Sequence, residues 1–152
     1  MAVAIRTFKS YSEAMKAVLP NSNTMKLIGQ DIVKHIKQKI DNNKATGSPL
    51  SQRTIARKTE IGALEPVTTK LREGGDLRDK IKETHSEAGV EIGWGSENHE
   101  PLITRSKTIK VCDLAKVHHT GSGVPKRTVL EFDEETDKII EDKLRQRIIG
   151  TV

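Results

Sequence analysis

The sequence predicts a single α+β domain, in which a small antiparallel sheet is flanked by a long helix in the N-terminal half and by a C-terminal helix. Two charged stretches carry apolar residues every three to four positions, which is typical of amphipathic helices. Shorter stretches between them alternate apolar and polar residues, as half-buried strands do. A chain of 152 residues suits one core. We place the domain at residues 23–150, preceded by an arm or short helix over residues 1–22.

The first long helix is predicted to begin at Asn23, whose side chain can cap its first turn. It ends at the polar run Asp41-Asn42-Asn43, which contains poor helix formers. Lysines separate the apolar positions of this stretch, so one face is buried and the other solvated. The apolar positions are Met25, Ile28, Ile32, Ile36 and Ile40.

Two short helices are predicted next. The first begins near Pro49, a residue favoured in a first helical turn, and runs through Lys58. Residues 59–69 show no clear period and are predicted to form a loop. After the break at Gly74-Gly75, Asp76 can cap a single turn that carries Leu77 and Ile81.

Two alternating segments are predicted to pair as a hairpin with a long tip. They are Val90–Trp94 and Lys107–Val111, and Gly, Ser, Asn or Pro residues bound both of them. Residues 112–118 favour a short helix that ends near Gly121. Residues 124–132 are then predicted to form another strand.

The final helix is predicted to have Asp133 as its N-cap. Acidic residues follow in its first turn and basic residues lie near its end, which suits the helix dipole. Ile140, Leu144 and Ile148 form its expected buried stripe.

Charge is distributed unevenly along the chain. The formal net charge is +5, yet residues 131–142 hold seven acids and one lysine. One interpretation is a solvated helix face beside ordinary surface lysines. The other is complementarity between copies of the chain, since head-to-tail contacts close into rings when their rotation permits.

Composition narrows the functional classes further. Hydrophobic residues make up 34% of the chain, a low share for a compact domain, so part of the stability is expected from neighbours. Aromatic residues make up 3%, which argues against a platform that stacks bases. The single Cys112 cannot form an internal disulfide and is expected to be a small core residue in a reducing compartment. Neither a secretory signal nor a membrane span is recognisable, so a soluble protein made in the cytoplasm is expected.

A search for chemistry yields no catalytic residue, and we expect neither an enzyme nor a metal or other cofactor. The five histidines have no zinc-ligand spacing, and the glycines form no phosphate-binding loop. No Gly-x-Ser-x-Gly elbow is present. Arg53, Arg57 and Lys58 could face DNA phosphates or a partner, although solubility explains surface cations equally well.

Two adjacent segments carry a recognisable pattern. Residues 114–121 read Leu-Ala-Lys-Val-His-His-Thr-Gly, and residues 124–130 read Val-Pro-Lys-Arg-Thr-Val-Leu. These segments resemble the Ala-x-x-His-x-x-Gly and Pro-x-Arg-x-x-Leu motifs of phage virion morphogenesis, or tail-completion, proteins, the head-tail joining proteins of Mu-like and P2-like phages. The similarity runs in order from about residue 28 to 147, although Thr128 stands where the family usually has a second proline. The matching motif residues are Ala115, His118, Gly121, Pro125, Arg127 and Leu130.

The resemblance implies a structural virion protein of the phage neck, assembled in the host cytoplasm. Such a protein completes the tail and joins it to the head as a ring of subunits. Its partners would be other copies of itself, a head connector or head-completion protein, and a tail terminator or tail tube protein, with DNA possible in the lumen. A tail terminator and a small DNA-binding protein are the alternatives.

Residues that could form the subunit interface combine one cation with several acids. Arg127 can clamp a carboxylate with two hydrogen bonds, either from the last helix or from the next subunit. The candidate interface residues are Arg127, Glu134, Glu135, Asp137 and Glu141.

Overall fold

The computed structural model describes residues 19–64, 66, 68–71, 74–99, 109–128, 130–131 and 133–150. Its elements follow the order α2 (Ser22–Asp41), α3 (Gln52–Glu60), α4 (Asp76–Asp79), β1 (Ile81–His85), β2 (Val90–Trp94), α5 (Val111–Thr120) and α6 (Glu134–Ile149). The predicted α+β class is confirmed. Most of the predicted N-terminal arm lies outside the described residues.

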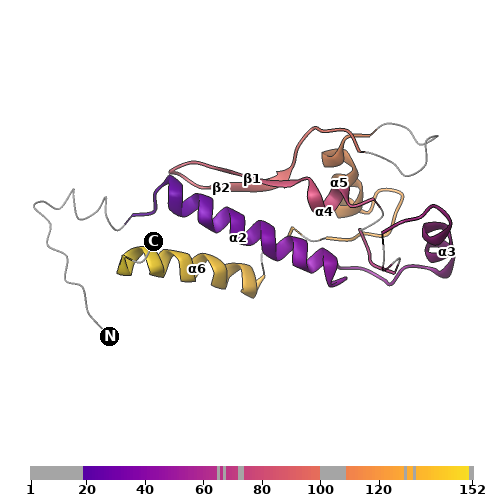
Figure 1. Ribbon diagram of the computed structural model, residues 1–152, viewed down its shortest axis with the longest axis horizontal. Helices are drawn as coiled ribbons and strands as arrows, with labels where there is room; N and C mark the ends of the chain where they lie inside the picture. The colour runs from indigo at the N-terminus through magenta and orange to yellow at the C-terminus, as the bar shows by residue number, and fades with distance from the viewer. Residues whose placement is uncertain are drawn as a thin grey trace, which may run out of the picture.

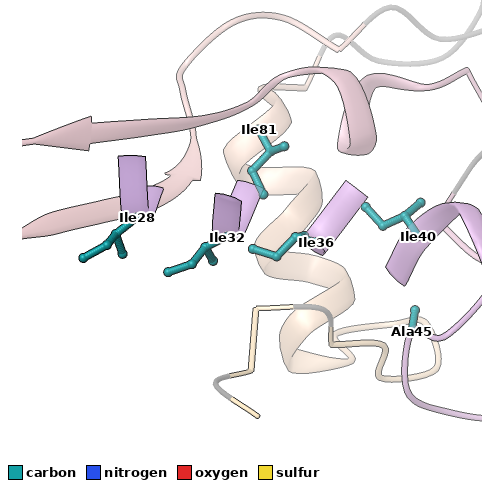
Figure 2. Close-up of a cluster of buried hydrophobic side chains, with 6 residues drawn as sticks. All are labelled: Ile28, Ile32, Ile36, Ile40, Ala45 and Ile81. Atoms are coloured by element: carbon teal, nitrogen blue, oxygen red, sulfur yellow. The ribbon is translucent and has the colours of Figure 1, made fainter. Parts of the chain in front are cut away.

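Helix α2 is the central element of the fold. It packs against the β1-β2 hairpin and against α6, as Figure 1 shows. Four isoleucines spaced four residues apart run along it and are buried with Ala45 and Ile81 (Figure 2). Ile40 is 0% exposed. The predicted periodicity therefore identified the main core.

Helix α2 begins two residues earlier than predicted. Its N-cap is Asn21, whose Oδ1 accepts hydrogen bonds from the backbone N and the Oγ1 of Thr24, at 2.9 Å and 3.0 Å. Asn23 is exposed within the first turn. Ser51 likewise caps α3 by accepting from the Thr54 backbone N at 3.2 Å, so Pro49 precedes that helix and does not begin it.

The predicted partner of Val90–Trp94 was wrong. Strand β2 pairs in antiparallel register with β1, Ile81 opposite Trp94 and His85 opposite Val90. The Ser86 backbone N donates to the Gly89 carbonyl at 2.9 Å and closes the turn. In the other predicted strand, residues 107–108 lie outside the described part of the chain, Lys110 forms only an isolated bridge with Asn98, and Val111 begins α5.

Gly29 lets α2 approach the hairpin closely. A Cβ at this position would lie 2.7 Å from Val90 Cγ2 and 3.0 Å from Glu83 Cβ. Neither distance is possible between real carbon atoms without movement. This contact could not be predicted, because an isolated glycine in a helical pattern usually only lowers helix propensity.

Helix α6 follows its predicted bounds but not its whole predicted stripe. Asp133 caps it, and Ile140 and Leu144 pack on the core, whereas Ile148 is 60% exposed. Every fourth residue of an α-helix advances by about 40° around the axis, so a stripe spaced in fours drifts away from a single neighbour. The stripe of α2 stays buried because that helix has neighbours on more than one side.

Candidate functional site

The first motif segment forms helix α5 and its C-cap. Ala115 is buried in a small cluster with Leu77 and Val111. The helix ends at Gly121, whose φ of +77° is favourable for glycine alone among common residues and whose N–H donates to the Val117 carbonyl at 2.9 Å. The confirmed end of α5 therefore reverses the chain toward the second motif segment.

The second motif segment is held by hydrogen bonds to a helix end and a loop, not by a sheet. The Arg127 backbone N donates to the His118 carbonyl at 2.8 Å. The Thr128 backbone N donates to Thr46 Oγ1 at 2.7 Å, and the Thr46 backbone N donates to the Thr128 carbonyl at 3.1 Å. Pro125 has no N–H to give to a ladder. The predicted strand over 124–132 is thus absent from residues 124–128 and 130–131, while Val129 and Phe132 lie outside the described residues.

Two cavities, of about 420 Å³ and 440 Å³, lie on either side of this pair of segments. Arg127 and His118 line both cavities, together with Leu71 and Leu77. Ala115 and Leu130 line the first cavity, and Pro125 lines the second. The motif residues other than Gly121 are therefore gathered around one hollow region, which we call the Arg127 pocket.

Arg127 has an unusual environment for a cation. It is 9% exposed, and its Nε is buried without a hydrogen-bond partner. Among the described residues no carboxylate pairs with it. Burial lowers the pKa of its guanidinium, because desolvation disfavours the charged form.

The acids that sequence reasoning linked to Arg127 lie elsewhere. Glu134, Glu135, Asp137 and Glu141 are exposed on the first half of α6. Glu135 lies 3.8 Å from His35 Nε2, and the described residues offer no ion partner to the other three. No residue of α6 lines the Arg127 pocket. Pairing of Arg127 with the last helix of its own chain is therefore excluded for these four acids.

The three predicted basic contacts separate into two kinds. Arg53 and Arg57 are exposed on α3. Lys58 is 3% exposed, and its Nζ donates to the Thr69 carbonyl at 2.7 Å. Its predicted outward role was wrong, because the loop at residues 68–70 covers the face of α3 that carries it.

The buried carboxylate of Asp76 has two partners that the sequence did not predict. Asp76 Oδ2 lies 2.5 Å from His99 Nδ1, and its Oδ1 lies 3.0 Å from Lys80 Nζ. The contact ties the loop at residue 99 to α4, and His99 lines the second cavity. Sequence spacing carries no signal for a pair 23 residues apart.

Cys112 lines the first cavity and is half-buried, whereas a core position was expected. In the described part of the chain, no group of three or more His, Cys, Asp or Glu residues is placed to hold a metal ion. No described helix is long and apolar enough to cross a membrane.

Comparison of the chain with protein-family models, with curated proteins and with solved structures gives no match. Functional inference therefore depends on the motif residues and on the arrangement described above.

Proposed function

We propose that this chain is a structural, non-enzymatic protein of a phage neck, which completes the tail and joins it to the head connector as a ring of subunits. One observation carries the proposal. The two segments that resemble the tail-completion motifs follow each other in the sequence, and a backbone hydrogen bond from Arg127 to His118 folds them around one pocket. Residues that form a functional unit in a family are expected to converge in this way.

The distribution of charge supports an assembly role. The first half of α6 presents exposed acids, and α5, whose residues line part of the Arg127 pocket, lies near the end of the hairpin opposite its turn (Figure 1). Opposite charges on separate parts of one surface favour head-to-tail association, and such contacts build rings when they close. Binding geometry, without chemical turnover, would be the mechanism.

A small DNA-binding protein is the alternative from another functional class. Arg53 and Arg57 are exposed together on α3 and could contact phosphates. A DNA-binding role predicts an affinity that falls steeply with salt, whereas tail completion predicts a fixed position in the particle. A tail terminator would share the virion location but occupy a different layer of the neck.

The proposed neck location is tested by finding the protein's position in phage particles and by measuring its mass in solution. Antibody labelling of phage particles in the electron microscope is expected to place it at the head-tail junction, and light scattering is expected to give a ring or an assembly-competent monomer. A monomer that is absent from particles and binds duplex DNA with steep salt dependence would overturn the proposal.

A further inference from the structure

Arg127 is a buried arginine that has no carboxylate partner among the described residues. Its side chain is more than nine-tenths buried, its Nε lacks a hydrogen-bond partner, and no carboxylate of the described residues reaches it. Buried polar groups in folded proteins almost always have partners, and a buried N–H without a partner is unfavourable. An apolar side chain of similar size would avoid this cost. Because the described residues supply no carboxylate to Arg127, an acid from another molecule would complete the pair.

The pocket around Arg127 defines the chemistry of that partner. Apolar side chains form much of the first cavity, including Leu71, Leu77 and Trp94. A guanidinium binds a carboxylate bidentately, and the apolar walls suit a ligand whose charge is carried on a short hydrocarbon stem. An aspartate or glutamate side chain has this form.

The same chain carries exposed aspartate and glutamate side chains on α6, which does not line its own pocket. Glu134, Asp137 and Glu141 project into solvent from α6 without ion partners among the described residues. Helix α6 lies along α2, whereas α3 and α5 lie toward the other end of the molecule (Figure 1). Among the described residues, Asp76 is the one acid that lines either cavity, and it is paired with Lys80 and His99, so a second copy of the chain offers the complementary charge.

We propose that the Arg127 pocket binds a carboxylate from the acidic first half of α6 of a neighbouring copy. The contact is heterologous, because each subunit gives its α6 to one neighbour and its pocket to the other. This inference rests on the proposed ring and deepens it by naming the two surfaces that meet.

Complementation between two variants tests this arrangement. Arg127→Met removes the pocket cation but leaves the acids. A second variant removes the acids but leaves the pocket, through the substitutions Glu134→Gln, Glu135→Gln, Asp137→Asn and Glu141→Gln. Each variant alone lacks one half of every contact and is expected to associate about 30-fold more weakly than the wild type or worse. An equimolar mixture can still form one contact and is expected to give a heterodimer, measured by light scattering or sedimentation.

Matched controls separate the contact from general charge effects. Glu87→Gln removes an exposed acid of the hairpin turn, and Arg53→Met removes an exposed cation of α3. Because Arg53 is itself a candidate partner contact, Lys26→Met, which removes an exposed cation of α2, serves as the neutral cation control. Glu87→Gln and Lys26→Met are expected to associate as the wild type does. Arg127→Lys keeps the charge without bidentate geometry, so it reports on the pocket if Arg127→Met fails to fold, as judged by circular dichroism.

Four outcomes overturn the proposal, and the first three concern self-association. They are wild-type association by a folded Arg127→Met, absence of a heterodimer from the mixture, and a wild-type chain that stays monomeric even at millimolar concentration. None of them decides where the protein lies in the particle, so the neck location stands or falls separately by labelling. Loss of duplex DNA binding in Arg127→Met, with self-association unchanged, would assign the pocket to phosphate and also overturn it.

Discussion

Asp133 joins the start of α6 to the middle of the fold. Its Oδ1 accepts hydrogen bonds from the backbone N and Oγ1 of Thr136, at 2.9 Å and 2.7 Å, which caps the helix. Its Oδ2 accepts from Lys39 Nζ at 2.9 Å, and its Oδ1 lies 3.5 Å from His35 Nε2. Two residues of α2 and the cap of α6 therefore depend on one carboxylate.

Two substitutions separate the cap from the charge. Asp133→Ala removes both, and we expect a loss of about 1 kcal/mol for the cap and about 0.5 kcal/mol for the partly exposed ion pair. For a domain of this length, such a loss lowers the melting temperature by about 3–6 °C. Asp133→Asn keeps a capping oxygen, so only the smaller loss is expected. Glu134→Gln, next in the chain and exposed, is the control that should change little.

The pH dependence has a definite sign. The hydrogen bond from Lys39, followed by those from Thr136, holds the pKa of Asp133 well below its ordinary range. A depressed carboxyl pKa stabilises the fold above the unfolded-state pKa, near 4, and this stabilisation is lost as the pH falls toward the folded-state pKa. The difference in melting temperature between wild type and Asp133→Asn should shrink as the pH falls below about 4.

Thermal unfolding followed by circular dichroism at several pH values measures these differences. The reasoning is refuted if Asp133→Ala melts within 1 °C of the wild type at pH 7, because neither the cap nor the ion pair would then stabilise α6. A gap between wild type and Asp133→Asn that widens on acidification would contradict the sign.

Three further substitutions probe the core and the pocket. Ile40→Ala should lower the free energy of unfolding by about 3 kcal/mol in urea denaturation, because Ile40 is fully buried. Gly29→Ala should lower the free energy of unfolding by about 1–2 kcal/mol, because the added Cβ would overlap Val90, even though alanine is the better helix former. Gln30→Ala, at an exposed position of the same helix, is the control. Arg127→Met should raise the unfolding free energy of the dilute monomer by about 1 kcal/mol, and a loss of similar size would show that the guanidinium has a stabilising partner within the subunit.

The helices could be predicted because their signals are local. The isoleucines of α2 repeat at helical spacing, and Asp133 and Gly121 mark ends that depend on neighbouring residues alone. Strand pairing depends on tertiary contacts. β1 reads Ile-Lys-Glu-Thr-His, with a single apolar residue, so it looks less like a strand than residues 107–111 do. Packing against α2 selects it nonetheless, which a propensity argument does not detect.

Part of the site could be predicted in the same way. The motif pattern places His118 and Arg127 in two successive segments, and the backbone hydrogen bond between them makes them neighbours in space. The burial of Arg127 and Lys58 could not be foreseen, because it depends on tertiary contacts that carry no local sequence signal. Long cationic side chains are usually solvated, so the ordinary expectation failed at both positions.

The motif region combines two features that weaken an isolated subunit. Its hydrophobic cluster has three buried members, Leu77, Val111 and Ala115, whereas the α2 cluster has six. It also contains Arg127, whose buried charge lacks a partner among the described residues. Local departures from good packing and polar pairing tend to occur at functional sites, where another molecule completes the arrangement. Here the departures fall on the residues that resemble the tail-completion motifs, so the least self-sufficient part of the fold is also the part for which we propose a neighbouring subunit.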